Sequence, residues 1–361
     1  MLLQRLTQPQ SFPQEMNEQG AEKKMFDTKL LSSELTDVEY AAELIKKGEV
    51  VGMPTETVYG LGADAENVEA VKKIFAAKGR PADNPLIVHL SSVDSMEKYV
   101  CSVPDLAYKI AEKFCPGPIT MVLPKREVIP YTTSGGLDTV GIRIPFHKTA
   151  RLLIELSGKA IAAPSANLSG SPSPTTARHV MNDMKGRIPA IIDGGACGVG
   201  VESTVISFEN DGIRLLRPGY VSAEDLSCFN VPVFTDKGIL EPVAEGEKVL
   251  SPGMKYKHYS PKANVTIVCG EYEAFANYVK QHNGSGVCAM IFDSDKPCEG
   301  VQTMTYGDTS EEQAAQLFAN LRKADELGIT QLYVRCPSRT GVGLAVYNRL
   351  LRAAGFEVVN V

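Results

Sequence analysis

Beyond residue 262 the chain alternates between short apolar runs and segments with helical spacing, and this alternation limits its possible folds more than any other feature. Strand-like runs are predicted at 265–269, 287–292, 331–335 and 356–359, with helical patterns at 272–281, 310–326 and 344–353 between them. A chain that adds strands in one direction must cross back over the sheet each time, usually as a helix. The sequence therefore predicts a small parallel, Rossmann-like α/β domain.

A glycine-containing turn opens the last of these helices. Gly341 and Gly343 stand at its start, but the third glycine of a dinucleotide-binding fingerprint is missing. The turn also comes late in the domain. The pattern therefore does not favour nucleotide binding at this turn.

Strand and helix patterns also alternate between residues 36 and 217. Thr36 followed by Glu39 predicts a capping box at the start of the first helix, and Gly48 stands where a C-terminal glycine belongs. Asn67 is expected to cap the next helix and Gly79 to end it. The predicted helices are 36–47, 67–78, 106–114, 149–156 and 176–184, and the predicted strands are 50–53, 86–90, 119–123, 140–144, 160–163, 191–195, 203–208 and 213–216.

Length and local composition suggest two domains with flanking segments, since 361 residues exceed the usual size of one domain. Residues 1–27 are rich in Gln and Pro and lack the continuous apolar core of a secretory signal, so a disordered extension is expected. Patterning begins after Met25, an alternative start. From 234 to 262 the periodicity fades while Gly, Pro and charge rise. The predicted division is a first domain at 28–233, a linker at 234–262 and a C-terminal domain at 263–361.

The charge and hydropathy of the chain argue against two classes of protein. The net charge is −6 and no run of Lys or Arg exceeds two residues, whereas tight nucleic-acid binders carry a basic surface. No apolar run approaches the ~20 residues of a membrane-spanning helix. The eight cysteines form no Cys-x-x-Cys pair, so neither a zinc site nor a disulfide framework is predicted. We interpret them as reduced thiols and expect a cytoplasmic protein.

A strand that ends in hydroxyl groups and glycines marks the first candidate site. The apolar run 50–53 leads into the sequence Pro-Thr-Glu-Thr-Val-Tyr-Gly-Leu-Gly at 54–62. Hydroxyls donate and accept hydrogen bonds, and glycines let a ligand approach the backbone. An ordinary strand-to-helix turn has the same composition, so this stretch alone leaves both interpretations open.

Further polar stretches add to this one. Lys78 and Arg80 precede Asn84, His89 lies in the next strand, Ser165 and Asn167 follow the strand at 160–163, and Ser203 begins another. The pairs Lys78/Arg80 and Ser165/Asn167 resemble the Lys-x-Arg and Ser-x-Asn signature of the YrdC-like family. With the tail Ser-Pro-Gly-Met-Lys-Tyr-Lys-His-Tyr-Ser-Pro at 251–261, the chain resembles its long threonylcarbamoyl-AMP synthases from about residue 30 to 361. The resemblance implies an α/β fold with a twisted mixed sheet flanked by helices, followed by the C-terminal domain.

The resemblance also implies a reaction. L-threonine, bicarbonate or carbon dioxide, and ATP would give threonylcarbamoyl-AMP and pyrophosphate, with Mg²⁺ on the phosphates. The adenylate would serve modification of an adenosine beside the tRNA anticodon, and a separate transferase complex would perform that transfer. Any contact of this chain with tRNA would be weak. Such chemistry rests on positioning and charge neutralisation, so the lack of a nucleophilic triad is no objection.

The resemblance assigns roles residue by residue. Threonine would be surrounded by Thr57, His89, Arg143, Ala163 and Ser203. ATP would be surrounded by Arg80, Asn84, Thr139, Ser165, Ser173, Arg217 and Tyr259. The catalytic signature would be Lys78, Arg80, Ser165 and Asn167. Because Tyr259 belongs to the predicted linker, the linker is expected to close over the site as a lid.

Several of these residues also have ordinary structural interpretations. Lys78 at a helix C-terminus would stabilise the helix dipole by ~0.3–1 kcal/mol. His89 in an apolar strand could be a packed core residue. Arg143 alternates with Val140, Ile142 and Ile144, so it points to the opposite face, where it pairs with a carboxylate of the protein or of a ligand.

Two other functional classes were weighed. A hydrogenase-maturation carbamoyltransferase also contains a YrdC-like module, but it would need an acylphosphatase segment and paired Cys-x-x-Cys zinc sites. A non-catalytic RNA-binding module would need a basic stripe with aromatic stacking residues. The sequence has none of these features, so it favours the synthase.

Overall fold

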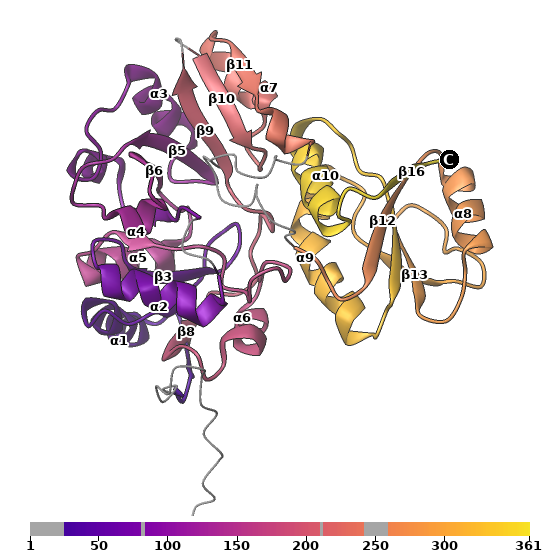
Figure 1. Ribbon diagram of the computed structural model, residues 1–361, viewed down its shortest axis with the longest axis horizontal. Coiled ribbons are helices and arrows are strands. Elements are labelled where there is room, and N and C mark those ends of the chain that lie inside the picture. The colour runs from indigo at the N-terminus through magenta and orange to yellow at the C-terminus, as the bar shows by residue number, and fades with distance from the viewer. Residues whose placement is uncertain (1–24, 81–83, 210–211, 242–258) are drawn as a thin grey trace, which may run out of the picture.

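The computed structural model describes residues 25–80, 84–209, 212–241 and 259–361, and they form two units, each built on one sheet (Figure 1). The N-terminal unit contains eleven strands in the order β1-β8-β2-β3-β7-β4-β6-β5-β9-β10-β11, and the C-terminal unit contains five in the order β14-β13-β15-β12-β16. The predicted fold class, a twisted mixed sheet with helices followed by a smaller parallel α/β unit, is confirmed.

The larger sheet mixes parallel and antiparallel pairs. Its strands are β1 (Lys29–Leu31), β2 (Val51–Met53), β3 (Gly60–Asp64), β4 (Ile87–His89), β5 (Ile119–Pro124), β6 (Thr139–Arg143), β7 (Ile161–Ala162), β8 (Ala190–Ile192), β9 (Thr204–Glu209), β10 (Gly212–Arg217) and β11 (Val233–Thr235). The pairs β4–β6 and β5–β9 are parallel, whereas β4–β7 and β5–β6 are antiparallel. Strands from distant parts of the chain therefore end beside one another.

Helices and short 3₁₀ turns cover this sheet. They are α1 (Leu35–Lys46), α2 (Val68–Lys78), η1 (Val93–Lys98), α3 (Asp105–Phe114), α4 (Tyr131–Ser134), α5 (Lys148–Ser157), α6 (Ala177–Met184), α7 (Ala223–Leu226), η2 (Ser227–Phe229) and η3 (Lys237–Ile239). The predicted limits of α2 are confirmed, because the Asn67 side chain accepts from two backbone N–H groups and Gly79 takes a left-handed φ of 62°. The helix therefore ends at Lys78, next to the candidate site.

The predicted capping box of α1 is wrong. The helix begins one residue earlier, after Glu34, and no side chain caps it. Asp37 is engaged in two hydrogen bonds of 2.7 Å from the backbone N–H and hydroxyl of Ser32. This local turn fixes the entry of the chain before Thr36 is reached, so Thr36 lies inside the helix.

The C-terminal unit has the predicted parallel sheet. Its elements are β12 (Asn264–Cys269), α8 (Tyr272–Gln281), β13 (Val287–Ile291), β14 (Gln302–Thr305), α9 (Ser310–Glu326), β15 (Gln331–Arg335), α10 (Gly341–Ala353) and β16 (Val358–Asn360), and every strand pair is parallel. Thr309 and Glu312 form a capping box at α9. All eight cysteines of the chain are free thiols.

Helices α9 and α10 pack against the N-terminal unit (Figure 1). Gly200 lies so close to α9 that a Cβ there would be 2.3 Å from the carbonyl oxygen of Ala314. Arg322 of α9 forms an ion pair of 2.7 Å with Asp183, and the Asn348 side chain of α10 donates to the Ile239 carbonyl at 2.6 Å. The two units are therefore joined by buried polar contacts as well as by apolar packing.

Three predicted features lie partly or wholly outside the described residues. Of the extension at 1–27 only 25–27 are described, and the Phe26 N–H donates to the Gly186 carbonyl at 3.0 Å. The predicted linker at 234–262 begins inside β11 and includes η3, while 242–258, which contain most of the expected lid, are outside. The domain limits and the lid stay predictions. Among the helices that the structure describes, none is long and apolar enough to cross a membrane.

Candidate active site

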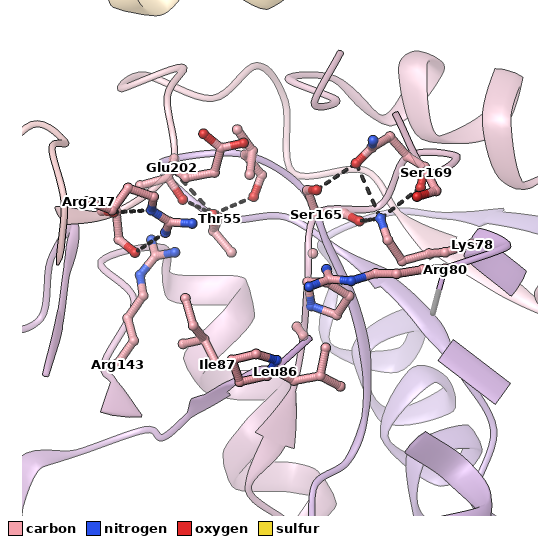
Figure 2. Close-up of a pocket in the computed structure, with 18 of the residues that line it drawn as sticks. Thr55, Lys78, Arg80, Leu86, Ile87, Arg143, Ser165, Ser169, Glu202 and Arg217 are labelled. Carbon is pink, nitrogen blue, oxygen red and sulfur yellow. Dashed lines mark hydrogen bonds between the residues drawn. The ribbon is translucent and has the colours of Figure 1, made fainter. Parts of the chain in front are cut away.

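A pocket lies where the ends of α2, β4, β6, β7 and β10 meet the loops after β2 and β8 (Figure 2). Eleven of the fourteen predicted site residues line it: Thr57, Lys78, Arg80, His89, Arg143, Ala163, Ser165, Asn167, Ser203, Arg217 and Tyr259. The pairing of β4 with β6 places His89 directly beside Arg143. Segments far apart in the sequence thus supply one continuous lining.

Lys78 connects the two halves of the Lys-x-Arg and Ser-x-Asn signature. Its side chain is 3% exposed, and Nζ donates to the carbonyl oxygens of Ser165 and Asn167, the latter at 2.8 Å. The Ser165 hydroxyl donates to Asn167 Oδ1 at 2.6 Å. Burial, with nearby Arg80, holds the pKa of Lys78 well below its ordinary value. Lys78 therefore contacts the turn at 165–167 as well as ending α2, and both the structural and the catalytic interpretation of this residue stay open.

His89 is buried as a neutral imidazole. Its Nδ1 lies 3.2 Å from the Ile87 carbonyl and 3.3 Å from the Ile161 carbonyl. Because carbonyl oxygens only accept, Nδ1 carries the proton and Nε2 is left as an acceptor. Burial, followed by the charge of Arg143, lowers the pKa of His89 to about 3. The ring therefore offers the pocket an acceptor for a hydroxyl or an ammonium group.

Arg143 pairs with a carboxylate of the protein. Its Nη2 lies 2.7 Å from Glu56 Oε1, and both side chains are almost fully buried. Arg143 Nε and Glu56 Oε2 have no hydrogen-bond partner within the described structure. Glu56 thus engages one nitrogen of the guanidinium, and a ligand carboxylate could bind to the remaining donors.

Ser203 and Arg217 form a second cationic corner. The Arg217 Nε donates to the Ser203 carbonyl at 3.0 Å and its Nη2 to the Ser203 hydroxyl at 3.1 Å. Thr120 also contacts that hydroxyl at 2.8 Å. Burial lowers the pKa of Arg217 to about 10, so the group stays charged at neutral pH. Figure 2 shows Arg143 and Arg217 on one side of the pocket and Lys78 and Arg80 on the other.

Three predicted ATP residues do not line the pocket. Asn84 is buried beside it, at 4% exposure. Thr139 lines a second, small cavity that shares the segment 85–87 with the pocket. Ser173 is fully buried and donates to Glu202 Oε1 at 2.5 Å. In this structure, Asn84 and Ser173 can support the lining without forming it, and Thr139 lies at the neighbouring cavity.

Thr55 and Glu202 line the pocket and are absent from the predicted site. Thr55 Oγ1 donates to the Val58 carbonyl at 2.6 Å and lies 2.9 Å from the Thr57 hydroxyl, so Thr57 donates to Thr55. Glu202 directly precedes Ser203, and it is the one carboxylate among the described lining residues. Glu202 could have been identified from the sequence, because it is an acidic residue directly beside the predicted site residue Ser203.

Tyr259, near the end of the predicted linker and just before β12, reaches the pocket. Its ring packs on Phe318 of α9 at 5.2 Å between centroids, and Ser260 donates through its backbone N–H to the Gly170 carbonyl at 2.9 Å. Burial raises the pKa of the Tyr259 phenol, which stays protonated. The last residues of the predicted linker, Tyr259 and Ser260, are thus placed at the site.

Comparison with known proteins agrees with this geometry. A family model described as "Telomere recombination", for the Sua5, YciO and YrdC proteins, matches residues 43–219, and one described as "Threonylcarbamoyl-AMP synthase, C-terminal domain" matches 221–355. The threonylcarbamoyl-AMP synthase of Pyrococcus abyssi is 44% identical over 90% of this chain and 96% of its own length. The chain belongs to the threonylcarbamoyl-AMP synthase family.

Other members of this synthase family are similarly close. The Bacillus subtilis enzyme is 43% identical over 91% of this chain and 96% of its own length. The crystal structure of P. abyssi Sua5 complexed with L-threonine superimposes with a TM-score of 0.85 at 41% identity, covering 92% of this chain and all of that one. The family predicted from the sequence is therefore confirmed, and the two alternative classes are not favoured.

Proposed function

We propose that this protein is a nucleotidyltransferase that converts L-threonine, bicarbonate or carbon dioxide, and ATP into threonylcarbamoyl-AMP and pyrophosphate. The observation that carries the proposal is the pocket with two cationic sides, Lys78 with Arg80 and Arg143 with Arg217, around the neutral acceptor His89. Threonine brings one carboxylate and ATP a triphosphate. A pocket that must hold both anions in contact needs cations on both sides.

The residues suit the two halves of the substrate pair. Arg143 would hold the threonine carboxylate through the donors that Glu56 does not engage, and His89 Nε2 would accept from the threonine hydroxyl. Thr57, Ala163 and Ser203 complete that end. Arg80, Arg217 and Tyr259 would contact ATP, with Ser165, and Lys78 and Asn167 would orient the carbamoyl group against the α-phosphorus.

In this reaction the protein aligns the substrates and forms no covalent bond with them. Carboxylation turns the threonine nitrogen into an N-carboxylate, whose oxygen attacks the α-phosphorus while pyrophosphate leaves. Fixed donors aimed at the phosphates stabilise the charge that develops during transfer. Tyr259 and the residues next to it would exclude water from the pocket and so protect the labile intermediate and product.

Mg²⁺ is proposed as a companion of ATP. No group of three or more His, Cys, Asp and Glu side chains able to hold a metal occurs among the described residues, and both oxygens of Glu202 are already hydrogen-bonded. With few oxygens of the described residues free to bind a metal, the pocket fits an Mg²⁺ ion that is held mainly by the phosphates of ATP and by water. The ion would offset phosphate charge.

The biological setting is part of the same proposal. The adenylate would pass to a transferase complex that modifies tRNA next to the anticodon, in the cytoplasm. Any direct contact of this chain with tRNA would be weak, because the net charge is −6.

Pyrophosphate release tests the proposed function. Release should require ATP, threonine and bicarbonate together, and mass spectrometry should show threonylcarbamoyl-AMP as the product. Release without threonine, or none when all three are present, would contradict the proposal.

A further inference from the structure

Arg349 crosses from the C-terminal unit to the edge of the pocket. It lies on α10 and is completely buried. Its Nε donates to Glu202 Oε2 at 3.0 Å, its Nη2 donates to the Glu202 backbone carbonyl at 3.2 Å, and its Nη1 donates to the Pro218 carbonyl. One side chain thus ties α10 to the residue before Ser203 and to the residue after Arg217.

Glu202 is the only pocket-lining carboxylate among the described residues, and both of its oxygens are occupied. Oε2 accepts from Arg349 and Oε1 accepts from the Ser173 hydroxyl at 2.5 Å. Burial raises the pKa of Glu202, but Arg349 and then Arg217 outweigh it and hold the pKa below its ordinary value. Glu202 is therefore an anion that sits where anionic substrates are to bind.

Unpaired, this carboxylate would oppose substrate binding. Buried like charges repel strongly because the surroundings screen them poorly. The cations that line the pocket are needed for the substrates, and Arg217 already uses two donors on Ser203. Arg349 does not line the pocket, so it can neutralise Glu202 without being withdrawn from substrate.

We propose that Arg349 is a positioning residue for the nucleotide half of the pocket. It neutralises Glu202, keeps that side chain on Ser173 and holds the Pro218 carbonyl beside Arg217. The C-terminal unit thereby completes the active site instead of only adjoining it. This inference rests on the proposed synthase function.

Because Glu202 titrates, the role of Arg349 can be measured as a pH dependence of the KM for ATP. The charged and titratable groups around it are Arg349 from α10, Arg217 from β10, Lys78 from α2 and Tyr259. In Arg349→Met, burial remains while the main neutralising partner is gone, so the pKa of Glu202 rises. Glu202 would then be protonated at low pH and would repel ATP only as the pH increases.

The experiment compares ATP kinetics in the full-length chain, measured by pyrophosphate release. Arg349→Met should raise KM for ATP about tenfold or more, equivalent to about 1.4 kcal/mol of binding, with a smaller change in kcat. This KM should increase from pH 6.5 to 8.5 more steeply than in the wild type. Arg349→Lys keeps the charge and should restore most of the affinity.

A neighbouring variant controls for simple loosening of the interface. Asn348→Ala removes a buried contact between α10 and Ile239 and a contact of 3.3 Å that Arg349 Nη1 donates to Asn348 Oδ1. It leaves the bonds of Arg349 to Glu202 and Pro218, so its KM for ATP and its pH profile should match the wild type. Equal defects in Asn348→Ala and Arg349→Met would show that only docking matters and would overturn the proposal.

The double variant Glu202→Gln/Arg349→Met isolates the charge. It should recover ATP affinity relative to Arg349→Met and lose the extra pH dependence, because the uncompensated carboxylate is gone. If Arg349→Met fails to fold, the double variant and Arg349→Lys are compared with the wild type, and a KM for ATP about tenfold or more above that of the wild type in both would refute the role. Failure of both to bind ATP better than Arg349→Met, or a folded Arg349→Met with wild-type KM, would refute the role. An inactive wild type would refute the synthase function instead.

Discussion

Buried neutral His89 makes the stability of this protein sensitive to mild acid. In the folded chain burial lowers the pKa of His89 to about 3, whereas in an unfolded chain a histidine titrates near ~6.5. Between these values the unfolded state binds a proton that the folded state does not. The contribution of neutral His89 to the free energy of unfolding is therefore fully present above about pH 6.5 and is lost as the pH falls toward 3.

The size of the effect follows from the two pKa values. Between pH 7.5 and 5.0, about 1.5 pH units lie below the pKa of His89 in the unfolded chain. Each of these units lowers the free energy of unfolding by about 1.4 kcal/mol, so the total loss is about 2 kcal/mol. His89→Gln cannot take up this proton. Its free energy of unfolding should thus fall by about 2 kcal/mol less than that of the wild type over the same pH interval.

Urea unfolding at both pH values measures this difference. Burial also lowers the pKa of His179, to about 4, but that residue is present in both proteins and cancels in the comparison. His282→Gln, at an exposed position, is the matched control and should behave like the wild type. Equal pH dependence in His89→Gln and wild type would refute the buried neutral imidazole.

Further predictions concern substrate binding and packing. Arg143→Ala should weaken threonine binding about ten- to hundredfold, because a charged hydrogen bond contributes roughly 1.5–3 kcal/mol, and should affect ATP far less; isothermal titration showing intact threonine affinity would contradict this, and Arg80→Ala should damage ATP use first. Valine should be used at least about a hundredfold less efficiently than threonine in the pyrophosphate assay, because it leaves the polar groups of the pocket unpaired; equal turnover would count against the assignment. Gly219→Ala should lower stability by about 1–3 kcal/mol, since its Cβ would lie 2.2 Å from the Thr204 backbone nitrogen, whereas Gly198→Ala meets nothing within 4 Å and should keep the wild-type melting temperature.

Local patterns predicted most helices and several strands but not the short strands that neighbours create. Strand β3 reads Gly-Leu-Gly-Ala-Asp, which is typical of a turn, and it is a strand because β2 and β7 supply partners on both sides. Strand β14 reads Gln-Thr-Met-Thr, with a single apolar residue. Both segments are strands because neighbouring strands pair with them, and the periodicity of a local sequence contains no information about such pairing.

For the site, local motifs predicted which residues converge but not what lies behind them. Lys78 with Asn167 could be recognised as a signature. That Arg143 would face Glu56, or that Glu202 would be matched by Arg349, depends on contacts across 87 and 147 residues of chain. Thr139 carries a hydroxyl at a strand start, yet it lines a second cavity next to the segment 85–87 and not the pocket itself. Side-chain type indicates chemistry, and only the packed fold decides which side of a strand is available.

The strand order of the larger sheet has a consequence for synthesis on the ribosome. Strand β2 takes β8 as its parallel neighbour, with Val51 opposite Ala190, and β1 then pairs with the other side of β8. The chain between β2 and β8 is about 140 residues long, which takes roughly seven to thirty seconds to translate at usual rates. During that interval the nascent chain exposes an unpaired apolar strand edge, a template for association with other chains. Rapid expression at high temperature should therefore favour aggregation of this protein, and slower translation or a chaperone that covers extended apolar segments should raise the soluble yield.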